Sequence, residues 1–127
     1  MGEKILRSIR GAVCAENTVE SIINNVGDLC RTLFRDNRIS GGEIVNVQFT
    51  VTQDLDEINP ATAFRRAKDL GIDASAVPLF CSQEPAVRGM LPRVVRIMVT
   101  AYMDSESKIV PVYINGAEKL RPDLAGA

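Results

Sequence analysis

The sequence has 127 residues, 46% of them hydrophobic and 24% charged, and its 15 lysines and arginines against 16 aspartates and glutamates give a formal net charge of −1. This length and composition are those of an ordinary globular chain, so we expect one domain over residues 1–127 with a short polar tail from about residue 116. The near-zero charge argues against a nucleic-acid surface, and the absence of histidine excludes Ser-His-Asp and Cys-His triads, HExxH zinc sites and histidine general bases.

The three cysteines, at positions 14, 30 and 81, are odd in number and show no CxxC spacing. This pattern indicates neither a disulfide framework nor a zinc site, and it favours a reducing compartment. Charges interrupt the apolar residues of the N-terminal stretch, which therefore lacks the core of a signal peptide, and no run approaches the roughly 18 apolar residues of a membrane span. We therefore expect a cytoplasmic protein with no metal, membrane or nucleic-acid partner.

The first two elements are predicted by an aliphatic run and by a helical repeat. Residues 5–13 are rich in aliphatic side chains and indicate a strand. Asn17, with Glu20 three positions later, is a candidate helix cap. The apolar residues that follow recur at helical spacing: Val19, Ile22, Ile23, Val26, Leu29, Cys30, Leu33 and Phe34. This pattern predicts a long amphipathic helix.

A glycine pair at 41–42 separates this helix from a second strand and a second helix. Residues 44–52 alternate between apolar and mostly polar side chains, as in a half-buried strand. Asn59 followed by Pro60 is typical of a helix start. The apolar face of that helix, Phe64, Ala67 and Leu70, predicts that it continues until Gly71.

The last third of the chain is rich in strands. Residues 77–81 predict a brief strand, and residues 85–92 can hold at most a short turn of helix. Residues 93–103 are β-branched and apolar at both odd and even positions, which is typical of a central strand covered on both faces. Residues 108–114 predict a final strand, and Pro111 within it indicates a sheet edge or a bulge.

The order β-α-β-α-β-β-β indicates an α+β (α/β-like) fold in which two helices pack on one face of a mixed sheet of about five strands. Two helices cannot cover both faces of such a sheet. An oligomer in which the uncovered faces meet would bury them, so we expect one.

Two arginines do not fit a plain apolar core. Arg96 lies in the middle of the strand predicted to be most buried, where a guanidinium is costly unless it is paired. It either awaits an anionic ligand or forms a structural ion pair, for which Glu84 is a candidate. Arg10 raises the same question at the end of the first strand, and only one of Arg7 and Arg10 can face a given side of the sheet.

The remaining polar candidates look ordinary when taken singly. Cys81 would pack as a small core residue because no base lies near it in the sequence, and Tyr113 would pack within the last strand. Arg65 and Arg121 would be solvated. Together, several arginines with one carboxylate, one thiol and one phenol favour electrostatic catalysis on an anion, in which two arginines hold carboxylates and another meets developing charge.

Five collinear segments carry a family resemblance: IRGA (9–12), TQDL (52–55) before Pro60-Ala61, CSQE (81–84), RVVRIM (93–98), and VY (112–113) with LRPDL (120–124). In their order and spacing they resemble the small, monofunctional, trimeric chorismate mutases, from about residue 5 to residue 124. The resemblance implies a homotrimer with a barrel-like core of sheets, helices outside, and three active sites at subunit interfaces. It also implies the cofactor-free rearrangement of chorismate to prephenate in aromatic amino-acid biosynthesis.

The resemblance assigns roles to residues of this sequence. It implies that Arg96 is the cation beside the ether oxygen, where negative charge builds as the C–O bond breaks. Arg10, helped by Tyr113, is expected to bind the side-chain carboxylate. Glu84, with Cys81, is expected to hold the ring hydroxyl. Because the site is shared between subunits, we expect some of these residues to come from a neighbouring chain.

Further residues are expected around the mouth of the site: Arg65, Leu120 and Arg121, with Ala61 as an apolar wall. Three positions depart from the family pattern. Asn59 stands where an aromatic wall residue is common, Thr62 where a basic residue can occur, and Phe80 where threonine is usual. These departures affect the lining of the pocket more than its charges, so we expect them to weaken affinity before they abolish the reaction.

Two alternatives remain open at this point. One is a non-catalytic trimeric module that binds a small carboxylate metabolite through the same arginines. The other is a related trimeric protein that acts on imine or enamine intermediates. The joint presence of Arg10, Glu84 and Arg96 favours the mutase, because a general anion site needs no carboxylate opposite its cations.

Overall fold

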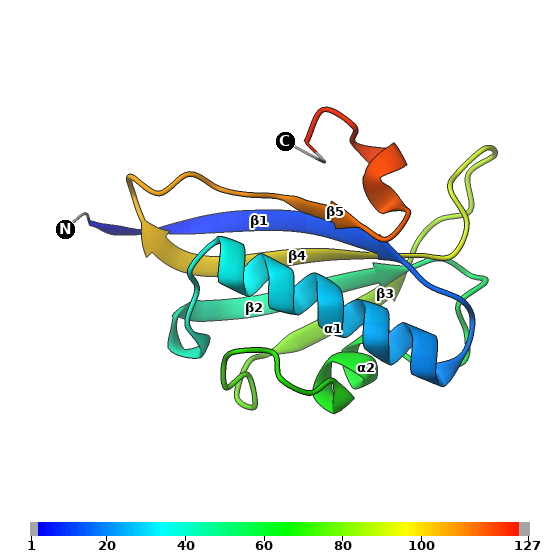
Figure 1. Cartoon of the computed structure of the whole chain (residues 1–127), viewed down its shortest axis with the longest axis horizontal. Helices are drawn as coiled ribbons and strands as arrows, with labels where there is room; N and C mark the ends of the chain where they lie inside the picture. Colours follow the sequence, from blue (N-terminus) through cyan, green and yellow to red (C-terminus); the bar gives the residue numbers. More distant parts are fainter. Residues whose placement is uncertain (1–2, 125–127) are drawn as a thin grey trace.

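A computed structural model of the chain describes residues 3–124, which form a five-stranded mixed sheet with two α-helices packed on one face (Figure 1). The predicted α+β order is confirmed. The elements in chain order are β1 (Lys4–Cys14), α1 (Val19–Asp36), the short 3-10 helix η1 (Gly41–Glu43), β2 (Ile44–Val51), α2 (Pro60–Arg66), β3 (Leu79–Gln83), β4 (Val94–Asp104), β5 (Val112–Ile114) and the 3-10 helix η2 (Ala117–Leu120).

The sheet has the strand order β3-β2-β4-β1-β5. The central strand β4 runs antiparallel to both of its neighbours, β1 and β2. The two edge strands are parallel to theirs, β3 to β2 and β5 to β1. The prediction that residues 93–103 form the central strand is therefore confirmed, and β5 lies at an edge, as Pro111 indicated.

The first helix begins one residue later than its sequence predicts. Thr18, not Asn17, is the N-cap, and its hydroxyl accepts a hydrogen bond from the backbone N–H of Ser21 at 3.0 Å. The side-chain oxygen Oδ1 of Asn17 instead accepts from the backbone N–H groups of Asp56 and Glu57 at 3.0 and 3.1 Å. Asn17 thus ties the loop before α2 to the start of α1.

The second helix starts as predicted but ends early. Asn59 is its N-cap, and the side chain accepts from the N–H of Ala61 at 2.7 Å. The predicted continuation to Gly71 is wrong, because the backbone is already extended at Ala67 (φ −64°, ψ 143°) and turns left-handed at Asp69 (φ 57°). The apolar residues beyond Arg66 belong to a loop that packs on the core, so their spacing imitates a longer helix.

Two strands differ from their predicted bounds by more than one residue. β3 occupies residues Leu79–Gln83 and not 77–81. Of the segment CSQE (81–84), only Glu84 therefore lies after the strand. β5 has only three residues because Pro111 has no N–H to continue the ladder. Just before it, the side-chain amide of Asn37 pairs with the backbone N–H and C=O of Val110 at 2.8 and 2.9 Å.

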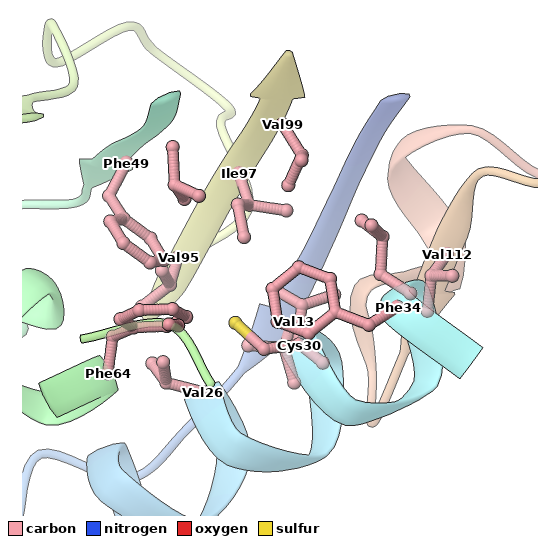
Figure 2. Close-up of a cluster of buried hydrophobic side chains, with 14 of the residues drawn as sticks. Val13, Val26, Cys30, Phe34, Phe49, Phe64, Val95, Ile97, Val99 and Val112 are labelled. Atoms are coloured by element: carbon pink, nitrogen blue, oxygen red, sulfur yellow. The ribbon is translucent and has the colours of Figure 1, made fainter. Parts of the chain in front are cut away.

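The core lies between the helices and the sheet (Figure 2). Three phenylalanines from three elements meet there. The Phe64 ring of α2 is 6.3 Å from the Phe34 ring in an edge-on contact and 5.9 Å from the Phe49 ring. Side chains at odd positions of β4, namely Val95, Ile97 and Val99, close this core from the sheet side.

The opposite face of the sheet is largely open within one chain. The even positions of β4 from Arg96 to Tyr102 point to this face and remain wholly or partly exposed, so the expectation that the strand is covered on both faces is wrong for the single chain. Large apolar side chains on the open face include Leu6, Phe80, Met98 and Tyr102, which are 53%, 66%, 41% and 48% exposed.

The C-terminal segment covers one end of the open face. Ala117 of η2 is buried in a small second cluster with Ala12, Val94 and Tyr113, and Leu120 and Leu124 pack against it. Part of the predicted solvated tail is therefore packed structure. The rest of that tail, residues 125–127, lies outside the described residues. No helix within residues 3–124 is long and apolar enough to cross a membrane.

Candidate active site

A cavity of about 370 Å³ lies on the open face of the sheet, beside the packed C-terminal segment. Five of the residues singled out from the sequence line it: Arg10, Glu84, Arg96, Tyr113 and Arg121. Side chains from β1, β4 and β5 thus meet a residue that follows β3 and one from the C-terminal segment.

Strand register places the two central arginines on the same face. Ala12 pairs with Arg96 and Arg10 pairs with Met98, so Arg10 and Arg96 are diagonal neighbours across β1 and β4. Arg7 lies on the helix-facing side, where its Nη1 donates to the carbonyl of Ser107 at 2.6 Å. The prediction that Arg7 and Arg10 face opposite sides is confirmed.

The Arg96 guanidinium is held from one side. Its Nε lies 3.0 Å from Oε1 of Glu84, and the same oxygen accepts a hydrogen bond from the Thr50 hydroxyl at 2.8 Å. Thr50 stands directly opposite Arg96 in the β2–β4 ladder. Glu84 is only 18% exposed, whereas Arg96 is 47% exposed. Among the described residues, neither Nη group of Arg96 donates a hydrogen bond, so both can bind a ligand.

A second cationic wall is formed by Arg10 and Arg121. Arg121 makes a two-pronged ion pair with Asp123, from Nε at 3.0 Å and from Nη2 at 2.7 Å. This hydrogen bonding raises the pKa of the Arg121 guanidinium and lowers the pKa of the Asp123 carboxyl. Arg10 forms no ion pair within residues 3–124, so its charge is available to an anion.

Four predicted site residues do not line this cavity in the single chain. Cys81 pairs with Phe49 and therefore points to the helix side, near Ala61 of α2, where burial raises the pKa of its thiol. Arg65 donates to the carbonyls of Ala74, at 2.6 Å, and Val77, so it braces a loop. Leu120 packs against the second cluster.

Five further residues line the cavity: Gly11, Gln48, Thr50, Ile97 and Met98. Gly11, Ile97 and Met98 lie in the family segments, but none of the five was assigned a role in the site. The side chains of Gln48, Thr50 and Met98 face the same side of the sheet as Arg96, and strand alternation is the sequence signal that could have identified these three residues. Residues 3–124 hold no group of three or more Asp, Glu or Cys side chains arranged to bind a metal.

The chain is thus an α+β protein with an arginine-rich cavity on the open face of its sheet. The chorismate mutase type I family model matches residues 6–124. The chorismate mutase AroH of Thermus thermophilus is 37% identical over 97% of this chain and 99% of its own, and that of Bacillus subtilis is 32% identical over 95% and 94%. A solved chorismate mutase from Clostridium thermocellum superposes with a TM-score of 0.77 at 31% identity, over 89% of this chain and 98% of its own. The chain belongs to the chorismate mutase type I family, which confirms the resemblance carried by its motifs.

Proposed function

We propose that this protein is a chorismate mutase, which rearranges chorismate to prephenate in aromatic amino-acid biosynthesis. The observation that carries the proposal is the convergence of three arginines and one carboxylate on a single cavity of about 370 Å³. Chorismate is a small dianion with a ring hydroxyl, and this site offers cations for its two carboxylates, a further cation, and an acceptor for the hydroxyl.

The reaction needs a restrained substrate and a placed positive charge. It is a unimolecular pericyclic step, so no nucleophile and no proton transfer takes part. The flexible enolpyruvyl side chain must be held folded over the ring. Negative charge grows on the ether oxygen as the C–O bond breaks, and a fixed cation beside that oxygen stabilises the transition state more than the ground state.

Arg96 is the residue we assign to the ether oxygen. Its Nε is held by Glu84, so the guanidinium plane is oriented before substrate arrives, while its Nη groups face no protein acceptor among the described residues. A donor that is oriented in advance needs little reorganisation when charge develops. Glu84 uses Oε1 for Thr50 and Arg96, which leaves Oε2 to accept a hydrogen bond from the ring hydroxyl.

Arg10, Tyr113 and Arg121 are assigned to the carboxylates. Arg10 has no ion-pair partner within residues 3–124, and Tyr113 lies beside it on the cavity wall with its ring packed in the second cluster. Arg121 stands at the edge of the cavity, and Asp123 holds its guanidinium plane. A planar guanidinium matches a carboxylate in two parallel hydrogen bonds, so these residues both bind and orient the substrate.

The assembly we propose is a homotrimer in which neighbouring chains complete each site. Two observations support it. The open face exposes large apolar side chains, among them Phe80 on the edge strand β3. In addition, Cys81, Ala61 and Arg65 lie away from their own chain's cavity, on the β3–α2 side of the molecule. If the β3–α2 edge of a neighbouring chain covered the cavity, it would bring these three residues of the neighbour to the substrate.

The setting we propose is the cytoplasm. The three cysteines of the protein are free thiols, and Cys30 is fully buried in the core. Free thiols of this kind persist in a reducing compartment.

The proposal is tested by adding chorismate to the purified protein with a chelator present. We expect chorismate to be consumed with prephenate as the product. Arg96→Ala should lower kcat by roughly 10²- to 10³-fold, the usual effect of removing one oriented charge-stabilising donor. Arg35→Ala, which removes an exposed arginine of α1 away from the cavity, is the matched control and should leave kcat unchanged.

Three results would count against the proposal. Turnover no faster than the spontaneous reaction excludes the mutase. Tight binding of chorismate without turnover favours a non-catalytic module that binds a carboxylate metabolite. A near-normal kcat in Arg96→Ala would show that the Arg96–Glu84 ion pair has only a structural role.

A further inference from the structure

The chain enters β4 through a left-handed residue, three positions before Arg96. Arg93 has φ +53°, a conformation that non-glycine residues adopt at an energetic cost. β4 starts at the next residue, Val94, and the side chains of Val94 and Arg96 point to the same face. The backbone at Arg93 therefore sets where the strand that carries Arg96 begins.

Two side chains at the end of β2 hold this backbone. The Arg93 N–H donates to both carboxylate oxygens of Asp54, at 3.1 and 3.0 Å. The Thr52 hydroxyl donates to Asp54 Oδ1 at 2.6 Å and accepts from the Val94 N–H at 2.9 Å. A hydroxyl has one hydrogen, so its donation to Asp54 turns a lone pair toward Val94. We call this arrangement the Asp54 clasp: Thr52, Asp54 and the N–H groups of Arg93 and Val94.

The clasp and the Arg96–Glu84 ion pair share a single short segment. Thr50 donates to Glu84, and Thr52 and Asp54, two and four residues further on, bind the amides at the start of β4. Thr52 is buried and Asp54 is exposed, so the contact reaches from the sheet to the surface. Residues 50–54 thus fix the Glu84 carboxylate and the start of the strand that carries Arg96 relative to each other.

We propose that Asp54 and Thr52 are positioning residues for Arg96, an inference that rests on the proposed mutase function. Without the clasp, Arg93 relaxes from its left-handed conformation and the start of β4 shifts. A displacement of about 1 Å at a catalytic group can cost about 10²-fold in rate. Arg10 and Arg121 stand on other elements, so carboxylate binding is retained. The loss therefore falls on kcat and spares KM.

The test uses two nearly isosteric variants of the full-length protein. Asp54→Asn removes one of the two acceptor oxygens, and Thr52→Val removes the hydroxyl. Each should lower kcat for chorismate by about 10- to 100-fold, with KM within about threefold of wild type. Thr52→Ser keeps the hydroxyl and should restore kcat to within about threefold. Glu57→Gln is the matched control, because that carboxylate lies on the same loop and accepts no hydrogen bond from residues 3–124.

A double variant separates positioning from general stability. If Asp54 acts through Arg96, Asp54→Asn should lower kcat less than about threefold further in an Arg96→Lys background. Wild-type kcat in Asp54→Asn, or an undiminished loss in the Arg96→Lys background, overturns the inference. So does failure of both Asp54→Asn and Thr52→Val to fold, since the clasp would then hold the fold and not the site. Wild-type protein without turnover overturns the proposed function and this inference with it.

Discussion

The ion pair between Arg96 and Glu84 is poorly suited to a purely structural role. Arg96 is about half exposed, and exposed pairs contribute only about 0–1 kcal/mol to stability. Its guanidinium also leaves two Nη groups without protein acceptors among the described residues. A residue selected for stability would place those donors against carbonyls, as Arg65 does with Ala74 and Val77. The contrast between these two arginines favours a ligand-binding role for Arg96.

The relative reactivity of the three cysteines can be predicted and measured without a substrate. Burial raises the pKa of all three cysteines, most strongly that of Cys30. A thiol with a raised pKa holds less thiolate at a given pH, and the thiolate is the reactive form. At about pH 8, native protein treated with iodoacetamide should leave Cys30 unmodified and modify Cys14 and Cys81 more slowly than free cysteine. In denaturant all three should react. Mass spectrometry reports each site, and labelling of native Cys30 as fast as Cys14 would contradict the burial argument.

Individual side chains were predictable from sequence only where strand alternation decides their direction. The opposite faces of Arg7 and Arg10 follow from parity, and Glu84 was a candidate partner for Arg96 before its position was known. The direction of Cys81 was not predictable. Cys81 lies within both the predicted strand, 77–81, and the observed one, but so short a strand carries no pattern long enough to fix its bounds or to show which of its side chains face the helices.

At the scale of elements, the approach of β5 to β1 depends on Gly11. A Cβ added there would collide with the carbonyl oxygen of Val112 and lie 3.2 Å from a methyl carbon of Leu29. Gly11→Ala must therefore push β5 outward, together with Tyr113. We expect a loss of about 1–3 kcal/mol in the free energy of unfolding, measured by urea denaturation, and a raised KM for chorismate.

The matched control for that prediction is Gly42→Ala. No atom lies within 4 Å of a Cβ added at Gly42, so the substitution should change stability by less than about 0.5 kcal/mol. Equal effects of the two substitutions would show that crowding against β5 does not determine the cost. A destabilised Gly11→Ala protein with normal KM would show that β5 does not position Tyr113.

The elements themselves were largely predictable, and their ends were not. Long periodic runs identified α1 and β4, because many side chains share one face. The end of α2 was missed because Leu70 packs on the core from a loop and continues the helical spacing. The cap of α1 was placed one residue early because Asn17 and Thr18 are both good caps. Only the contact of Asn17 with the 56–57 backbone distinguishes them, and that contact spans about 40 residues of sequence.

At the scale of the whole molecule, the element count already indicated an uncovered sheet face. Two helices cover one side, and the other side exposes Leu6, Phe80, Met98 and Tyr102. The element count could not reveal that Arg10 and Arg96 share this same face with the apolar residues. Strand order decides that, and strand order depends on long-range pairing. In the proposed trimer, the contact that buries the open face also closes the cavity, so we expect assembly and activity to be coupled.

This coupling is tested by a charge on the open face. The protein should elute with a mass about three times the 13.9 kDa of one chain when measured by light scattering. Tyr102→Glu places a carboxylate where the proposed trimer buries a phenol, and an unpaired buried charge is costly, so the trimer should dissociate and kcat/KM should fall together. Tyr102→Phe and Asn24→Glu, the latter on the exposed side of α1, should remain trimeric and active. A trimeric Tyr102→Glu protein would exclude the sheet face as the interface, and a fully active monomer would show that activity does not require that face to be covered.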